Sequence, residues 1–134
     1  MQINLNHCEA AQDLLMQTVI ETKVDVVLIS EPYKKPSVPR WWTDKSQTAV
    51  LWVRNNFIVS NIDADAHDGF VSACVNGITI YSCYLAPSIN LAAYQNILDH
   101  LTHNSRGKDN ILIGGDFNAL AVEWGSKRTS PRAL

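Results

Sequence analysis

The chain has 134 residues, of which 46% are hydrophobic and 18% charged, and its formal net charge is −2. This length suits one domain with a buried core, and this composition excludes an intrinsically disordered chain. The net charge argues against a strongly cationic nucleic-acid platform, although a nuclease needs only local basic clusters.

Cysteine usage and hydropathy point to an intracellular compartment. Cys8, Cys74 and Cys83 show no C-x-x-C pairing, and an odd number suits a reducing environment better than a disulfide framework. No apolar run approaches the roughly 20 residues that a membrane span needs. The N-terminus lacks the basic start and apolar stretch of a signal peptide. We therefore expect a nuclear or cytoplasmic protein that is neither secreted nor membrane-bound.

The first third of the chain predicts a strand, a helix and a strand. Residues 2–5 alternate polar and apolar, which is typical of a strand, and apolar residues then recur at helical spacing over 8–22. Residues 24–30 form a nearly continuous β-branched run, as in a strand that is covered on both faces. Residues 32–46 hold three prolines and two tryptophans, and this composition predicts a loop.

The middle and end of the chain predict four strands, a second helix and a final strand. The strands cover 48–53, 57–62, 69–75 and 78–85, and the Asn-Gly pair at 76–77 predicts a hairpin. The helix covers 87–101 with Ser88 or Asn90 as its cap, and residues 110–115 form the last strand. The order β-α-β, antiparallel meander, α-β places the helices over one face of a mixed sheet.

Polar side chains follow the last strand, in the stretch "ILIGGDFNAL" at 111–120. Side chains two residues apart on a strand point the same way, so Asp116 and Asn118 face one site. The two preceding glycines let the backbone turn or another group approach closely. Asp116 is suited to orienting or deprotonating a water, and Asn118 to contacting a phosphate oxygen. A polar turn that closes the strand explains the same residues equally well.

Two other strand ends favour a site. Glu31 follows the strand at 24–30, and Asn4 lies near the end of the first strand. Ligands of open α/β sheets gather at the carboxyl ends of strands. Carboxylate and amide oxygens in such a cluster suit Mg²⁺.

Four motifs in this order resemble one known family. "QINLN" (2–6), "LISEPY" (28–33), "YSCYLAP" (81–87) and "GGDFNALAVEWGS" (114–126) are similar to the endonuclease/exonuclease/phosphatase superfamily. More narrowly, they resemble the apurinic-endonuclease-like domain of non-LTR retrotransposon polyproteins of insects. The resemblance implies a four-layer α/β sandwich of two packed sheets, of which this chain is the N-terminal part.

The resemblance also implies a reaction and roles for the strand-end residues. The reaction is Mg²⁺-dependent phosphodiester hydrolysis that nicks DNA, with Mn²⁺ as an alternative metal. Glu31 and Asn4 would hold the metal or its waters, Tyr84 would contact the scissile phosphate, and Asp116 would activate the attacking water with help from Asn118. The implied partners are DNA and the remainder of a retrotransposon polyprotein. Phosphatase or other phosphoesterase activity is an alternative within the same fold.

The chain departs from the family in one respect. Family members continue to a Ser-Asp-His motif whose histidine contacts the phosphate, and this sequence contains no such motif. Residues 1–134 therefore predict a partial domain that lacks its C-terminal part and is weakly active or inactive. A non-catalytic relic or interaction module is the rival interpretation. Half of a sandwich would also leave an apolar sheet face uncovered, on residues such as Leu51, Val53, Val59, Val71, Ile80 and Ile111.

Short basic clusters are candidates for binding the substrate. One lies in the loop that holds Lys34, Lys35 and Arg40, and another near the end of the chain holds Lys127 and Arg128. Such clusters bind phosphates in nucleases, but they are more often merely solvated loops. The adjacent pair Trp41 and Trp42 would either stack on bases or form a hydrophobic lid over the sheet.

Overall fold

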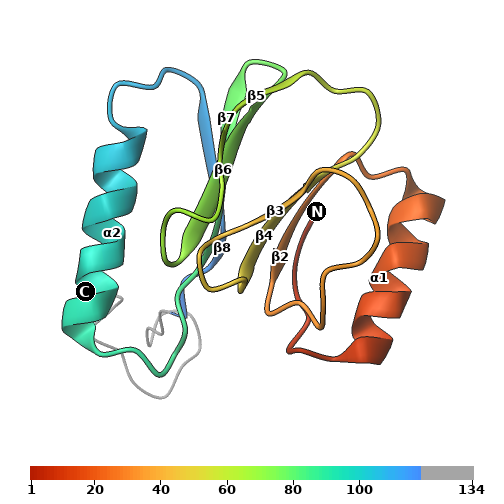
Figure 1. Cartoon of the computed structure of the whole chain (residues 1–134), viewed down its shortest axis with the longest axis horizontal. Coiled ribbons are helices and arrows are strands. Elements are labelled where there is room, and N and C mark those ends of the chain that lie inside the picture. Colours follow the sequence, from red (N-terminus) through yellow and green to blue (C-terminus); the bar gives the residue numbers. More distant parts are fainter. Residues whose placement is uncertain (119–134) are drawn as a thin grey trace, which may run out of the picture.

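Two β-sheets packed face to face, with a helix outside each, make up the fold (Figure 1). The computed structural model describes residues 1–118 of the chain. The first sheet has the order β1 (Gln2–Asn4), β2 (Val26–Ser30), β4 (Ala49–Val53), β3 (Trp41–Thr43). The second has the order β5 (Val59–Asp63), β6 (Phe70–Val75), β7 (Ile78–Tyr84), β8 (Ile111–Asp116). The helices are α1 (Glu9–Thr22) and α2 (Leu91–Ser105).

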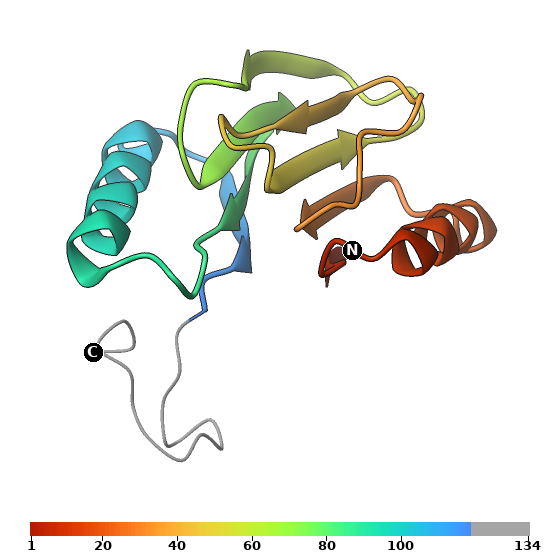
Figure 2. The ribbon, with the colours of Figure 1, turned by 60° about the horizontal axis from the view of Figure 1, so that its bottom comes forward.

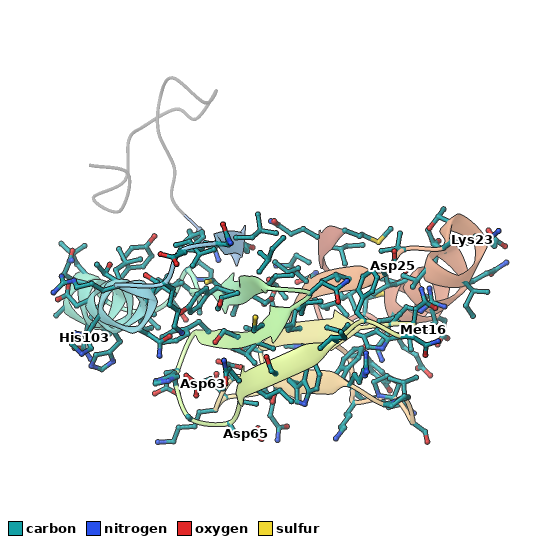
Figure 3. All side chains as sticks on the ribbon, turned by 90° about the horizontal axis from the view of Figure 1, so that it is seen from above. Met16, Lys23, Asp25, Asp63, Asp65 and His103 are labelled. Atoms are coloured by element: carbon teal, nitrogen blue, oxygen red, sulfur yellow. The ribbon has the colours of Figure 1, made fainter. Side chains whose placement is uncertain are left out.

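The helices lie at opposite ends of the molecule, as the view from above shows by the positions of Lys23 and His103 (Figure 3). In each sheet one pair of neighbouring strands is parallel, β1 with β2 and β7 with β8, and the other pairs are antiparallel. Figure 2 shows the two sheets between the two helices.

Three apolar layers hold the four layers of backbone together. On β4, Leu51 and Val53 face the second sheet, whereas Val50 and Trp52 pack with α1. This alternation follows from the two-residue period of a strand that is buried on both faces. The third layer joins α2 to β6 and β7. The four-layer α/β sandwich predicted by the resemblance is confirmed.

The expectation that both helices cover one face of one sheet is wrong. Helix α1 packs on the first sheet and α2 on the second. The predicted meander is also interrupted, because β4 ends in the first sheet at Val53 and β5 begins in the second sheet at Val59. Strand patterns report which residues are buried and do not report in which sheet a strand lies.

The expectation of an uncovered sheet face is wrong for most of its residues. Residues 1–118 contribute four strands to each sheet, so each sheet buries the inner face of the other. Leu51, Val53, Val71 and Ile80 are buried there, and Val59 is partly buried. Ile111, on the edge strand β8, is exposed.

Local signals placed several element boundaries correctly. Asn90 caps α2, since its side-chain oxygen accepts the Ala93 N–H at 2.8 Å, although the helix runs to Ser105 rather than to 101. The Asn-Gly pair forms the β6–β7 hairpin with positive φ at Asn76 and Gly77. The predicted loop over 32–46 contains β3, which pairs with β4. Among the described residues, no helix is long and apolar enough to cross a membrane.

Candidate active site at the strand ends

Four strand ends from both sheets meet at one edge of the sandwich. Asn4 ends β1, Glu31 follows β2, Tyr84 ends β7 and Asp116 ends β8. The parallel pairing of β1 with β2 and of β7 with β8 brings the carboxyl ends of each pair to the same edge. These ends lie at the bottom of the molecule in Figure 1.

Hydrogen bonds join the four side chains in two pairs that bridge the sheets. The Tyr84 hydroxyl donates to Glu31 Oε1 at 2.9 Å, and Asn4 Nδ2 donates to Asp116 Oδ2 at 3.0 Å. Beside them, Gln2 Nε2 donates to the Gly115 carbonyl at 2.7 Å. The site is therefore built by the contact between the sheets rather than by either sheet alone.

The two glycines before Asp116 permit this contact. A Cβ atom on Gly115, whose φ is +135°, would lie 2.0 Å from the Cys83 carbonyl oxygen. A Cβ atom on Gly114 would lie 2.8 Å from Leu28 Cδ2 in the first sheet. At Gly115 the close atoms are backbone and φ is positive, so only glycine fits beside β7, whereas at Gly114 the close atoms are the movable ends of the Leu28 and Gln2 side chains.

Glu31 has an unfavourable backbone conformation that its neighbours hold in place. Its φ is +50°, in the left-handed region that side chains other than glycine rarely adopt. Its N–H donates to the Thr48 carbonyl, and its own carbonyl accepts the His7 N–H, both at 2.9 Å. Strain of this kind clusters at functional sites and persists where the surroundings enforce it.

Tyr84 is buried between two carboxylates and is kept neutral. Burial first, and then the hydrogen bond to Glu31 and the charges of Glu31 and Asp116, raise its pKa from 10.0 to about 12. The phenol therefore remains a hydrogen-bond donor throughout the physiological pH range.

The contacts of Asn118 fit both interpretations of the polar residues after β8, a turn that closes the strand and a functional site. Its N–H donates to Asp116 Oδ1 at 3.0 Å, which is the closing turn, and its Nδ2 donates to the Leu85 carbonyl at 2.7 Å. The turn orients Asp116. Within residues 1–118, the second N–H of this amide and its oxygen bind no other group.

The donor set suits a hard, hydrated cation. Mg²⁺ uses one or two carboxylates and keeps several waters, and Glu31 and Asp116 supply two carboxylates. The Asn4 oxygen already accepts the Asn6 N–H at 2.8 Å, so its amide chiefly orients Asp116. Within residues 1–118, no three His, Cys, Asp or Glu side chains form a group that could hold a metal. A cation at these strand ends would thus depend on water or substrate oxygens for the rest of its shell.

The basic residues of the 32–46 segment differ in whether their side chains are exposed to a substrate or bound within the fold. Lys34 and Lys35 are exposed and line a cavity of about 650 Å³ that also contacts Tyr33 and Trp42. Arg40 has a structural contact, because its Nη1 donates to the carbonyls of Asn55 and Phe57 on the segment that crosses between the sheets. Lys127 and Arg128 lie outside the described residues.

The tryptophan pair lies on β3, where Trp41 is buried and packs against Trp52 at 5.7 Å between ring centroids. Trp42 packs against the apolar layer between the sheets. This arrangement favours the hydrophobic lid over base stacking for Trp41.

Sequence reasoning missed His7, which lies beside Glu31. Its Nε2 is 3.5 Å from Glu31 Oε1, and its Nδ1 is 3.1 Å from the Pro32 carbonyl oxygen. Its place in the loop directly after β1, next to Asn4, is the one signal that pointed to this position.

Two comparisons with known proteins agree with this geometry. A family described as endonuclease-reverse transcriptase matches residues 78–134. The solved structure of the endonuclease domain of TRAS1, a telomere-specific non-LTR retrotransposon, matches with a TM-score of 0.79 and 25% identity. The match covers 98% of this chain and 64% of that chain, so this chain spans about two thirds of the domain that it resembles. No curated protein matches the chain significantly.

The fold is thus that of the endonuclease class of α/β sandwich, which both comparisons support. The narrower resemblance to the endonuclease domain of non-LTR retrotransposons, predicted from the four motifs, is confirmed.

Proposed function

We propose that the strand-end site hydrolyses phosphodiester bonds in DNA with Mg²⁺, as the endonuclease part of a retrotransposon polyprotein. The observation that carries this proposal is the hydrogen-bonded cluster of Asn4, Glu31, Tyr84 and Asp116 across the contact between the sheets. The similarity to a retrotransposon endonuclease domain supports it.

Each side chain has a role that suits its surroundings. Asp116, oriented by Asn4 and by the Asn118 N–H, accepts the proton of the attacking water. Tyr84, which stays neutral, donates a hydrogen bond from its hydroxyl to a phosphate oxygen when substrate replaces Glu31 as the acceptor. Lys34 and Lys35, which are exposed on the segment after Glu31, contact backbone phosphates.

Glu31 would hold the cation, and Asp116, whose charge also acts on Tyr84, would supply the second carboxylate of the site. Mg²⁺ bound there would stabilise negative charge on the phosphate and the leaving oxygen. Mn²⁺ would serve in the same site, because it also accepts carboxylate and water ligands.

Plasmid nicking tests the proposal. The purified chain is incubated with supercoiled DNA and Mg²⁺ beside Asp116→Ala and, as a matched control, Asp13→Ala on the exposed face of α1. Removal of a proton-accepting group typically slows such reactions by about 10²–10⁴-fold. We expect nicking to slow by this factor in Asp116→Ala and to stay unchanged in Asp13→Ala.

Equal nicking by the chain and Asp116→Ala would contradict the site. Absence of nicking by the folded wild-type chain would contradict activity of residues 1–134 alone, which is the outcome expected both of an inactive partial domain and of a non-catalytic relic.

A further inference from the structure

Helix α1 contains a buried polar side chain that the proposed reaction does not use. Gln12 is only 4% exposed, although it lies on a helix whose other glutamine, Gln17, is exposed. Buried amides are found where they satisfy specific partners, and the partners of Gln12 all lie in the segment that follows Glu31.

Gln12 binds the backbone of this segment three times. Its Oε1 accepts the N–H groups of Tyr33 at 2.8 Å and Lys34 at 3.3 Å, and its Nε2 donates to the Lys34 carbonyl at 2.8 Å. One side chain thus fixes two consecutive residues of the segment between β2 and β3, which contains no strand pairing with the described residues.

The segment begins at the strained residue. Glu31, with φ of +50°, is separated from Tyr33 only by the buried Pro32. The His7 and Thr48 backbone bonds hold Glu31 itself, and the Gln12 bonds hold the chain just after it. Without an anchor on this side, the segment is free to shift, and Glu31 can leave its unfavourable conformation.

We propose that Gln12 is a positioning residue that holds the Glu31 carboxylate in the candidate metal site through the backbone of residues 32–34. The inference rests on the proposed function, in which Glu31 holds the cation. Removing the amide releases the segment, so both the Glu31 backbone and the cation affinity change while the rest of the fold stays ordered.

The first test needs no metal. Amide hydrogen exchange is measured for the wild-type chain, for Gln12→Met, which keeps the length of the side chain, and for the control Gln17→Met. We expect amide exchange at Glu31, Tyr33 and Lys34 to become about tenfold faster in Gln12→Met. Exchange at Val50, in the centre of β4, reports the stability of the whole fold and should change much less. Unchanged protection at Glu31, or an equal change at Val50, would overturn the positioning role.

The second test measures Mn²⁺ binding by titration calorimetry for the same proteins and for Glu31→Gln. Loss of a group that supports a metal ligand typically weakens affinity by about 10–100-fold, which we expect for Gln12→Met and not for Gln17→Met. Undiminished affinity in Gln12→Met together with reduced affinity in Glu31→Gln would overturn the inference. If Glu31→Gln binds Mn²⁺ as well as the wild type while Glu31 exchanges faster in Gln12→Met, the proposed metal site fails and the positioning of Glu31 stands.

Discussion

Among single residues, Tyr84 shows how the site couples stability to pH. Its pKa is about 12 in the folded chain and near the ordinary 10.0 when unfolded. A raised pKa favours the neutral form, so its stabilising contribution is complete below pH 10 and disappears as the pH rises through 12. A pKa difference of two units between the folded and unfolded chain corresponds to a loss of at most about 3 kcal/mol in the free energy of unfolding.

We therefore expect the wild-type chain to lose stability relative to Tyr84→Phe between pH 10 and pH 12, because phenylalanine has no proton to lose. Urea unfolding of both proteins at pH 9, 11 and 12 measures the difference. Glu31→Gln should reduce this pH dependence in part, since burial remains after the charge and its hydrogen bond are removed. Parallel pH profiles for the wild type and Tyr84→Phe would show that Tyr84 titrates normally.

Sequence patterns located the strand-end residues but not the residues that support them. Glu31 and Asp116 could be found because each follows an apolar run, Asn4 because it lies near the end of the first predicted strand, and Tyr84 because of the family motif. His7, Gln12 and Asp44 act through hydrogen bonds to residues far along the chain, such as Gln12 to Lys34 and Asp44 to Gly69. No local pattern encodes such contacts. The catalytic and metal-binding roles themselves stay predictions.

Among the elements, the turn between β3 and β4 depends on a fully buried carboxylate. Asp44 Oδ1 accepts the N–H groups of Thr48 at 2.8 Å and Ala49 at 3.0 Å. Its Oδ2 accepts the Ser46 hydroxyl at 2.7 Å and the Gly69 N–H at 2.9 Å. Gly69 precedes β6 in the second sheet, so Asp44 joins the two sheets beside the site.

Asp44→Ala should lower the free energy of unfolding by about 3 kcal/mol or more, because it leaves several buried N–H groups without an acceptor. Asp44→Asn should cost less, since one amide oxygen can still accept. Urea unfolding measures both, and the exposed control Asp13→Ala should stay within about 0.5 kcal/mol of wild type. A small effect of Asp44→Ala would mean that water replaces the carboxylate in the turn.

Elements with strong local signals were predicted, and those defined by pairing were not. The Asn-Gly hairpin and the Asn90 cap follow from backbone preferences of a few residues. Strand β3 was missed, because three prolines precede it and only its pairing with β4 makes residues 41–43 a strand. The crossing from β4 to β5 was missed because a turn and a crossing segment have similar composition.

At the scale of the molecule, residues 1–118 leave an apolar edge of the second sheet exposed at β8. Within the described residues, β8 is the outermost strand of the second sheet on this side, and its first three residues expose 41%, 53% and 40% of their surface. By register, Leu112 lies beside Ile80, which faces the other sheet, whereas Ile111 and Ile113 flank the opposite face. An edge strand with apolar side chains on both faces is a template for pairing with another chain.

We expect the chain to self-associate through β8 as its concentration rises, and Leu112→Lys to weaken this association, because a charged side chain on an edge strand opposes pairing. Sedimentation velocity over a range of concentrations measures the effect. The control is Ile20→Lys on α1, where the wild-type side chain is 66% exposed but lies away from the sheet edge. If both variants reduce association equally, the added positive charge weakens association by raising solubility, and the β8 edge is not the interface. A selective effect of Leu112→Lys identifies the β8 edge as the interface, since the two substitutions add the same charge at similarly exposed positions.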